Sequence, residues 1–304
     1  MITIKDVFED YKLLNKVYEA NEVEAITLLA ISEISNLSKA YIKAFPEKEL
    51  NNDQALKLKD TLNRLQTGEP IQYILGRTEF YGLPFLVNSS VLIPRPETEE
   101  LVEWILYSLG ERQKEDERQK AKGERFGKQA ENNILDIGTG SGCIAISLKK
   151  NLPGARVSAI DISESALQTA KANAELNEVD VNFINVDILD PQLKTQNSKL
   201  SIYNIIVSNP PYVTLDDKKQ MHSNVTDFEP HTALFVPEHD PLVFYKAITD
   251  FALLNLVPGG LLFFEINENF GNETMEMLNT RGFRDVMVRK DMSGRDRMIK
   301  AQRP

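Results

Sequence analysis

The chain has 304 residues, which is too long for one ordinary domain and about right for two. Apolar residues make up 42% and charged residues 26%, so there is enough apolar material for a packed core, and wholesale disorder is excluded. The formal net charge of −10 argues against a protein that binds mainly by coating nucleic-acid phosphates, because such a surface is basic. Direct binding of nucleic acid is therefore not expected.

Metal-binding and membrane proteins are disfavoured by what the sequence lacks. The single cysteine, Cys143, excludes an internal disulfide and a multi-cysteine metal site. The three histidines form no H-E-x-x-H arrangement, so no metal is expected. The first residues show no basic segment followed by an apolar one, and no apolar run approaches the roughly 18 residues of a membrane helix. These observations predict a cytoplasmic protein without a membrane segment.

The first quarter of the chain differs in pattern from the rest. Apolar residues recur at helical spacing in residues 1–75, as in VFEDYKLL (7–14), which predicts a small all-helical domain. Residues 76–92 instead place β-branched and aromatic residues around Tyr81-Gly82, which predicts a β-hairpin linking this domain to the next. Residues 93–304 are then left for the larger, catalytic domain.

That larger domain begins with a helix and a charged segment. PRPETEELVEWILYSL (94–109) has prolines and acidic residues at its start, as a helix N-terminus prefers. Residues 111–131 carry six acidic and seven basic residues. They could be a nucleic-acid-binding tail, but a solvated linker insertion or frayed helix extension with nearly cancelled charge is favoured.

Short apolar runs then alternate with helical segments. NILDI (133–137), RVSAI (156–160), VNFIN (181–185) and YNIIVS (203–208) are typical of buried parallel strands. LLFFEI (261–266) adds a fifth strand. FRDVMVRK and RMIKAQ, separated only by a short turn, predict a closing antiparallel pair. The expected fold is α/β, a doubly wound seven-stranded sheet whose last strand is reversed.

The first chemical signal is LDIGTGSG (135–142), which comes at the end of the first of these strands. Glycines at alternate positions let the backbone turn sharply and approach a ligand closely. The dinucleotide fingerprint G-x-G-x-x-G would need a glycine where Cys143 stands. An acid two residues before the first glycine suits a ligand with an ammonium group, such as S-adenosyl-L-methionine, better than a pyrophosphate. The residues expected to hold this cofactor are Asp136, Gly138, Thr139, Gly140, Ser141 and Gly142.

Two further acids lie after the next strands. Asp161 ends the second strand, 21 residues beyond Gly140, where a carboxylate can accept both ribose hydroxyls of an adenosine cofactor. Its alternative role is to cap the following helix, which Ser163 could do instead. Asp187, just past the third strand, could accept from the adenine amino group, with Ile188 against the ring. A turn-forming role for Asp187 is equally consistent with its position.

The sharpest signal is Asn209-Pro210-Pro211-Tyr212, at the end of the fourth strand. Open α/β sheets bind ligands at the carboxyl ends of their strands. Two prolines fix an extended, donor-free backbone, so their carbonyls and the Asn209 side-chain oxygen can face a substrate NH2 group. Tyr212 offers a flat surface against which a planar group can stack. A rigid turn without function is the weaker alternative, given the glycine loop and the acid upstream.

Such a site suits transfer of a group to a planar nitrogen. An amide or nucleobase NH2 group is a poor nucleophile because its lone pair is delocalised. Two acceptors that hold its hydrogens favour a pyramidal nitrogen whose lone pair faces an electrophile, which stabilises the transition state specifically. A sulfonium methyl held in line makes the reaction a positioned displacement that needs no histidine or cysteine base.

Five segments together resemble the release-factor glutamine methyltransferases, the PrmC/HemK family. They are LIPRPETEELVE (92–103), LDIGTGSGCIAISL (135–148), IVSNPPYV (206–213), DFEPHTAL (227–234) and DMSGRDRMI (291–299). The resemblance runs in order from about residue 20 to the end. The Asn-Pro-Pro-Tyr motif alone is shared with adenine-specific DNA methyltransferases and some ribosomal-RNA methyltransferases, whereas PRPETE is much more specific to the glutamine enzymes.

The resemblance implies a fold and a reaction. Members have a seven-stranded, Rossmann-like methyltransferase domain, preceded by a helical domain that engages the substrate protein. They methylate the side-chain amide of the glutamine in the Gly-Gly-Gln loop of class I peptide-chain release factors, using S-adenosyl-L-methionine and releasing S-adenosyl-L-homocysteine.

Carried onto this chain, the resemblance makes Gly138–Gly142 the cofactor loop and Asp161 the ribose ligand. Asn209 would contact both cofactor and substrate amide, and Asn209–Tyr212 would hold the glutamine. Ile188 stands where some members have a tryptophan against the adenine. The resemblance further implies that two residues brace the wall of the active site, Arg95 and Glu97.

Two alternatives stay open at this point. A nucleic-acid methyltransferase acting on adenine or guanine amino groups could use the same Asn-Pro-Pro-Tyr chemistry, although the net charge of −10 and the PRPETE segment disfavour it. The second alternative is a non-enzymatic module that binds a translation factor and has kept a methyltransferase fold. The presence of every expected cofactor and Asn-Pro-Pro-Tyr position disfavours this second alternative.

Overall fold

The computed structural model describes residues 2–121, 132–194, 202–219 and 221–304. They form two compact units. Met1–Arg77 with Met221–Phe228 make up the helical unit, and Thr78–Gln220 with Glu229–Pro304 make up the sheet unit. Residues 221–228 were expected in the catalytic domain, whereas in the structure they cluster with the helical unit.

The helical unit is held together by one apolar core. Helices α1 and α4 begin at side-chain caps, where Thr3 and Asn51 accept from the backbone amides of Asp6 and Gln54. Apolar residues at helical spacing bury one face of each helix, with Ile4, Leu14 and Ile31 fully buried. The elements are β1 (Ile2–Thr3), α1 (Ile4–Tyr11), η1 (Lys12–Lys16), α2 (Ala20–Ser35), α3 (Lys39–Ala44), β2 (Glu49–Leu50), α4 (Asn52–Gln66), α5 (Ile71–Leu75) and α10 (Ser223–Phe228).

The helical unit also contains a feature that was not predicted from the sequence. Strands β1 and β2 pair antiparallel, with Ile2 opposite Leu50. Each strand has only two residues, which is too short for the period-two pattern that reveals strands in a sequence.

The sheet unit confirms the predicted seven-stranded sheet, with the order β10-β11-β9-β8-β5-β6-β7. Strands β5 to β9 pair in parallel, and β11 pairs antiparallel with β9 and β10, so the reversed ending is confirmed as well. The strands are β5 (Asn133–Ile137), β6 (Arg156–Asp161), β7 (Asn182–Asn185), β8 (Tyr203–Ser208), β9 (Leu256–Glu265), β10 (Arg284–Lys290) and β11 (Asp296–Gln302). The strand order reverses at β5, whose neighbours are β6 and β8. Such a switch point is where open α/β sheets bind ligands.

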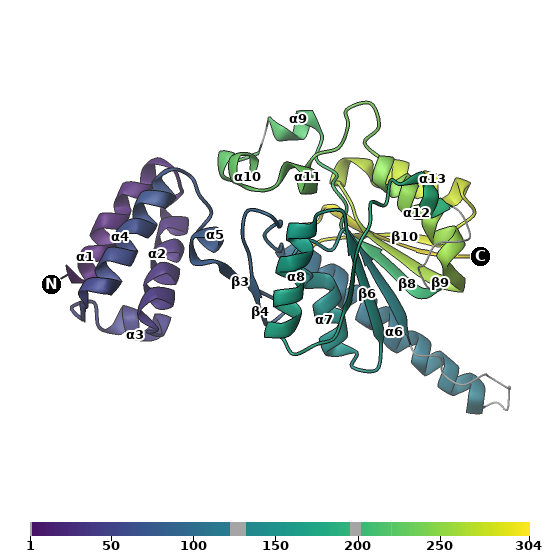
Figure 1. Cartoon of the computed structure of the whole chain (residues 1–304), viewed down its shortest axis with the longest axis horizontal. Helices are drawn as coiled ribbons and strands as arrows, with labels where there is room; N and C mark the ends of the chain where they lie inside the picture. Colours follow the sequence, from purple (N-terminus) through teal and green to yellow (C-terminus); the bar gives the residue numbers. More distant parts are fainter. Residues whose placement is uncertain (1, 122–131, 195–201, 220) are drawn as a thin grey trace. The chain divides into compact units, whose positions relative to one another are not determined.

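Helices cover both faces of the sheet (Figure 1). One face packs against α6 and α7, through strand residues such as Ile134 and Phe263. The other face packs against α12 and α13, through alternating strand residues such as Leu135 and Phe264. The remaining elements of this unit are α6 (Pro96–Ala121), α7 (Cys143–Asn151), α8 (Glu164–Leu176), η2 (Pro191–Lys194), α9 (Leu215–Lys218), α11 (His231–Leu234), α12 (Val243–Asn255), η3 (Glu268–Phe270) and α13 (Gly271–Thr280).

The predicted hairpin is formed by β3 (Arg77–Phe80) and β4 (Leu83–Leu86). Its two turn residues, Tyr81 and Gly82, have φ of 50° and 71°. Positive φ at both central residues matches the twist of the strands that a two-residue turn joins.

Helix α6 includes the first half of the charged segment. Residues 111–131 were predicted as a solvated linker insertion or a frayed helix extension, and α6, which continues to Ala121, bears out the helix extension as far as that residue. Residues 112–121 are almost all Glu, Arg, Gln and Lys, which have high helix propensity, and this explains why the helix continues. The rest of the predicted insertion, 122–131, lies outside the described residues.

A buried amide ties the hairpin to the glycine loop. Asn173 of α8 is 0% exposed; its Oδ1 accepts from Leu86 N at 2.6 Å, and its Nδ2 donates to Leu86 O at 3.0 Å and Ser141 O at 2.9 Å. Asn173→Ala is expected to lower the free energy of unfolding by about 2 kcal/mol, because the buried Ser141 carbonyl and two partly buried backbone groups of Leu86 lose their partner. Chemical denaturation measures this loss.

A matched variant separates this effect from the loss of any asparagine side chain. Asn182 lies exposed on β7, and its Nδ2 reaches Ser158 Oγ only at 3.4 Å. Asn182→Ala should change the free energy of unfolding by no more than about 0.5 kcal/mol. Equal losses in the two variants would contradict the role given to Asn173.

Candidate active site

One cavity of about 410 Å3 opens at the carboxyl ends of β5, β6 and β8. This is the switch point of the sheet, and the volume suits a drug-sized ligand. Eleven residues selected from the sequence line it: Arg95, Gly138, Thr139, Gly140, Ser141, Asp161, Asp187, Ile188, Asn209, Pro210 and Pro211. The other four, Asp136, Gly142, Glu97 and Tyr212, are not among the lining residues.

The glycine loop between β5 and α7 has the conformation that its sequence demands. Gly138 and Gly140 have φ of 71° and 54°, and a Cβ on either would meet no atom within 4 Å. Both line the cavity, so their lack of a side chain leaves the backbone open to a ligand. Gly142 serves packing instead, because a Cβ there would lie 2.9 Å from Ile146 Cδ1 and 3.2 Å from Ala170 Cβ.

Asp136 lies under this loop and is 0% exposed. Its Oδ2 accepts from Thr139 Oγ1 at 2.6 Å, while its Oδ1 has no hydrogen-bond partner among the described residues. Burial raises the pKa of Asp136 to about 7, against the lowering effect of the Thr139 hydroxyl and the Ala145 amide. The sequence suggested that Asp136 contacts an ammonium group directly. In the structure its buried carboxyl group instead holds the glycine loop through Thr139.

This raised pKa predicts how stability depends on pH. A group whose pKa is about 7 when folded and 3.8 when unfolded stabilises the fold below about pH 4, and this contribution is lost as pH rises to about 7. Between pH 5.5 and 7 the loss is about 2 kcal/mol, and Asp136→Asn should remove it. Chemical denaturation of the ligand-free protein between pH 5.5 and 7 should show the free energy of unfolding of Asp136→Asn rising relative to that of the wild type. A difference between the two free energies that does not change with pH would contradict the prediction.

Asp161, the last residue of β6, holds the glycine loop from the other side. Its Oδ2 accepts from Gly140 N at 2.8 Å and its Oδ1 from Ser163 N at 2.9 Å. Burial raises the pKa of Asp161, and these amides lower it. Helix α8 is capped by Ser163, whose hydroxyl accepts from Ala166 N. The capping role left open for Asp161 is thus taken by Ser163, and the carboxylate faces the cavity.

Asp187 and Ile188 lie just after β7 and also line the cavity. Asp187 Oδ1 accepts from Leu189 N at 2.8 Å, which is the turn-forming contact considered from the sequence. Apolar side chains from other loops and helices line the same cavity, among them Ile162 and Phe244. This part of the cavity can therefore take a flat, mostly apolar group.

The Asn-Pro-Pro-Tyr segment lies directly after β8 and connects to two other elements. Asn209 Nδ2 donates to Thr98 Oγ1 of α6 at 3.3 Å, and Tyr212 Oη donates to Glu265 Oε1 of β9 at 3.0 Å. Asn267 Nδ2 donates to the Tyr212 carbonyl at 3.1 Å, which fixes the end of the segment. The backbone is thus held rigidly, while Asn209, Pro210 and Pro211 line the cavity.

Arg95 forms an ion pair with the buried carboxylate of Glu229 next to this segment. Its Nη2 lies 2.6 Å from Glu229 Oε1, and the Glu229 side chain is 1% exposed. Glu229 Oε2 also accepts from Ile93 N at 3.3 Å, so it holds the chain on both sides of Pro94. Burial raises the pKa of Glu229, and the charge of Arg95 lowers it. Glu97 lies in the first turn of α6, outside the cavity lining.

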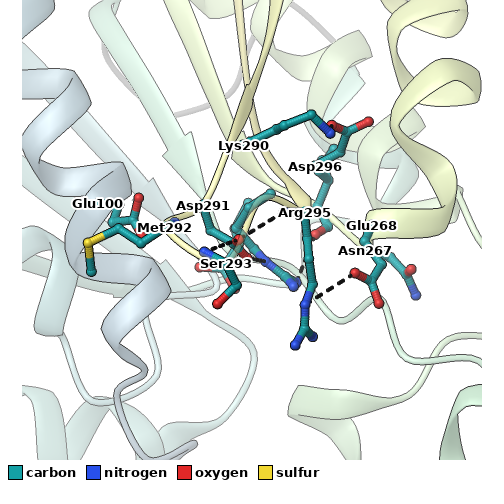
Figure 2. Close-up of polar contacts among 12 residues, drawn as sticks. Glu100, Asn267, Glu268, Lys290, Asp291, Met292, Ser293, Arg295 and Asp296 are labelled. Carbon is teal, nitrogen blue, oxygen red and sulfur yellow. Dashed lines mark hydrogen bonds and ion pairs between the residues drawn. The ribbon is translucent and has the colours of Figure 1, made fainter.

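The turn between β10 and β11 lies at the carboxyl end of β9, which is the end of the sheet where the cavity opens (Figure 2). Asp291 Oδ1 accepts from the amides of Ser293 and Arg295, and Met292 N donates to Glu100 Oε1 of α6 at 3.1 Å. Asp291 Oδ2 accepts from Arg297 Nε at 3.1 Å, in a pair whose side chains are 3% and 11% exposed. The turn thus holds one buried guanidinium whose charge acts on Glu265.

Three residues of the site were not selected from the sequence: Thr98, Glu229 and Glu265. Thr98 belongs to the PRPETE segment, and Glu265 ends the apolar strand LLFFE, where a buried acid at the carboxyl end is a usable signal. Glu229 lies in DFEPHTAL, one of the five segments that carry the resemblance, but no role was assigned to it from the sequence.

The lining fits S-adenosyl-L-methionine. The cradle of Gly138 and Gly140 admits close approach, Asp161 can accept from ribose hydroxyls, and Ile162 and Ile188 can contact a purine. Cys143 also lines the cavity, but burial raises the pKa of its thiol to about 12, so it stays protonated. Among the described residues there is no cluster of three metal-ligating side chains. The same residues include no helix with the length and apolarity needed to cross a bilayer.

Two family models match the chain, the PrmC N-terminal domain over residues 12–76 and the methyltransferase small domain over residues 118–227. The chain is 47% identical to the release factor glutamine methyltransferase of Flavobacterium psychrophilum, over 94% of each chain. It is 42% identical to that of Bacteroides thetaiotaomicron, over 95% of this chain and 96% of the relative.

Among solved structures, one similar protein is the release factor-specific protein-(glutamine-N5) methyltransferase from Alicyclobacillus acidocaldarius. It is 27% identical, covers 72% of this chain and 99% of that chain, and has a TM-score of 0.39. The curated relatives, at 47% and 42% identity over nearly their whole length, confirm the resemblance found in the sequence. The chain therefore belongs to the release factor glutamine methyltransferase family.

Proposed function

We propose that this chain transfers a methyl group from S-adenosyl-L-methionine to the side-chain amide nitrogen of the glutamine in the Gly-Gly-Gln motif of class I release factors. The observation that carries this proposal is the rigid Asn209-Pro210-Pro211 segment, which opens onto the same cavity as the glycine loop and Asp161. An acceptor for an amide NH2 group and a cradle for an adenosine cofactor thus share one enclosed space.

Different residues of the chain hold the cofactor and the substrate in the proposed reaction. Bound S-adenosyl-L-methionine would supply an electrophilic methyl group: its sulfur–methyl bond would break as the nitrogen–methyl bond forms, S-adenosyl-L-homocysteine would leave, and the methylated amide nitrogen would release one proton to solvent. Gly138, Gly140 and Asp161 hold and orient the cofactor. Asn209 Oδ1 and the Pro210 carbonyl accept the two amide hydrogens of the glutamine, which favours a pyramidal nitrogen with its lone pair toward the methyl group. Tyr212, which is not among the lining residues, holds this segment in place through its hydrogen bond to Glu265.

We also propose a substrate protein, a role for each domain and a cellular compartment for this chain. Class I release factors are the protein substrates, and the helical domain assigned to residues 1–75 engages them, with residues 76–92 linking it to the catalytic domain, 93–304. The reaction needs no metal, because positioned acceptors and an activated methyl donor supply its chemistry. Translation takes place in the cytoplasm, which is the compartment proposed for this chain.

Methyl transfer from labelled S-adenosyl-L-methionine to purified release factor tests this function. Label is expected on the wild-type factor and not on a factor whose Gly-Gly-Gln glutamine is replaced by alanine. A parallel panel of DNA and RNA tests the alternative acceptor. Label on nucleic acid alone would show that the amino-group chemistry is right and the substrate wrong. Tight binding of the factor without any label would favour a binding module.

A further inference from the structure

A chain of two hydrogen bonds connects Asn209 to a fully buried carboxylate. Asn209 Nδ2 donates to Thr98 Oγ1 at 3.3 Å, and Thr98 Oγ1 donates to Glu265 Oε2 at 2.6 Å. Thr98 and Glu265 are 2% and 1% exposed, so neither group can exchange its partner for bulk water. Thr98 and Asn209 line the cavity, and Glu265 is not among the lining residues.

The direction of these bonds is set by the carboxylate. An ionised carboxylate only accepts hydrogen bonds, and a threonine hydroxyl has a single proton to donate. Once Thr98 donates that proton to Glu265, its oxygen can only accept from Asn209. The Asn209 atom that faces Thr98 must then be the NH2 group, and its oxygen, Oδ1, is turned away from Thr98.

Several groups act on the charge of Glu265. Burial raises the pKa of Glu265, and the charge of Glu97 acts in the same direction. The hydroxyls of Thr98 and Tyr212 and the charge of Arg297 lower it. The 2.6 Å contact with Thr98 has the short length typical of a hydroxyl that donates to an ionised carboxylate.

We infer that Thr98 and Glu265 are positioning residues which fix the Asn209 amide with its oxygen toward the cavity, so that the site selects a substrate group that donates hydrogen bonds. This inference rests on the proposed function, in which the donor is the glutamine NH2 group. An Asn209 amide turned the other way would present its own NH2 group and would favour the glutamine carbonyl instead. Correct methylation therefore depends on two residues that need not touch the substrate.

Substitutions at both positions test the inference against a purely structural role. Thr98→Val keeps the shape and removes the hydroxyl; kcat is expected to fall about 10- to 100-fold with an unchanged KM for release factor. Thr98→Ser keeps the hydroxyl and should stay within about 3-fold of wild type. Glu265→Gln can donate to Thr98 and reverse the bonds, so it should lose as much kcat as Thr98→Val. Because both act through Asn209, the double variant should lose no more than either alone.

Thr274→Val is the matched control. Thr274 of α13 is also fully buried, and its hydroxyl donates to the carbonyl of Phe270, the last residue of η3, at 2.7 Å. This variant should keep the wild-type kcat. Calorimetric titration with S-adenosyl-L-methionine gives the fraction of competent protein in every variant, so that partial unfolding is separated from a loss of turnover.

A binding measurement reports the amide orientation without turnover. Release factor and its Gln→Glu variant in the Gly-Gly-Gln loop are titrated into enzyme saturated with S-adenosyl-L-homocysteine. The wild type should bind the glutamine form more tightly, and Thr98→Val should reduce this ratio. An unchanged ratio and kcat in Thr98→Val, or equal losses in Thr98→Val and Thr98→Ser, would overturn the inference. A wild-type enzyme that methylates no release factor would instead overturn the proposed function.

Discussion

Asn209→Ala is expected to lower kcat by about 10²- to 10³-fold, which is the size of effect seen when one preorganised hydrogen-bonding group is removed from a transition state. Asn209 lies at the carboxyl end of β8 and lines the cavity. In the proposed reaction its side-chain oxygen accepts one of the two substrate hydrogens that must move out of the amide plane as the nitrogen becomes pyramidal. This contact strengthens only as the reaction proceeds, so the loss falls on kcat rather than on substrate binding.

The affinity for S-adenosyl-L-methionine should change much less, because Gly138, Gly140 and Asp161 remain in place. Single-turnover kinetics measure the chemical step, and calorimetry measures the cofactor Kd. Asn204→Ala is a matched control, since Asn204 lies near the amino end of the same strand and its Oδ1 accepts from Asn133 N at 2.8 Å. Equal losses of turnover and cofactor affinity in Asn209→Ala would assign Asn209 a structural or cofactor role only.

The sheet was predictable because its signals are local. Each buried strand, such as NILDI or YNIIVS, is one short and mainly apolar run, and a parallel strand covered on both faces needs little else. The glycine loop and the Asn-Pro-Pro-Tyr segment each come directly after such a strand. Because parallel strands place their carboxyl ends at one edge, the two segments were predictable as neighbours from their order in the chain alone.

The contacts that orient these segments were not predictable, since they join residues far apart in the sequence. Thr98 and Glu265 are separated by 167 residues, and Asn173 reaches back 87 residues to Leu86. Propensity and periodicity describe neighbours along the chain, whereas these contacts exist only after α6 and α8 have packed on the sheet. In the sequence, such a long-range contact is signalled only by a polar residue that stands inside an apolar or helical pattern.

For Asp136 the sequence pattern predicted the correct segment, the glycine loop, but a different contact from the one in the structure. Its position before the first glycine suggested a partner for an ammonium group, yet the side chain is completely buried and holds Thr139 instead. Spacing along the chain fixes which loop carries a residue. The side of the loop on which the carboxyl group lies depends on strand register, since Asp136 pairs with Val207 and Ala159 inside the sheet.

Asp161→Ala is expected to weaken S-adenosyl-L-methionine binding by about 100-fold or more, because two charge-assisted hydrogen bonds to ribose hydroxyls are each worth about 1.5–3 kcal/mol. Charge reversal in Asp161→Lys should abolish binding. The carboxylate also accepts from Gly140 N, so a loosened glycine loop is a second source of lost affinity in Asp161→Ala. A comparison of two ligands separates these causes.

The 2′-deoxy analogue of S-adenosyl-L-homocysteine lacks one of the hydroxyls that Asp161 is expected to hold. The wild type should bind it about 10- to 100-fold more weakly than S-adenosyl-L-homocysteine itself, whereas Asp161→Ala should bind the two ligands equally. A loosened loop alone would weaken both ligands by the same factor and leave the ratio intact in the variant. Calorimetry that returned the same ratio for both proteins would therefore assign Asp161 to the loop rather than to the ribose.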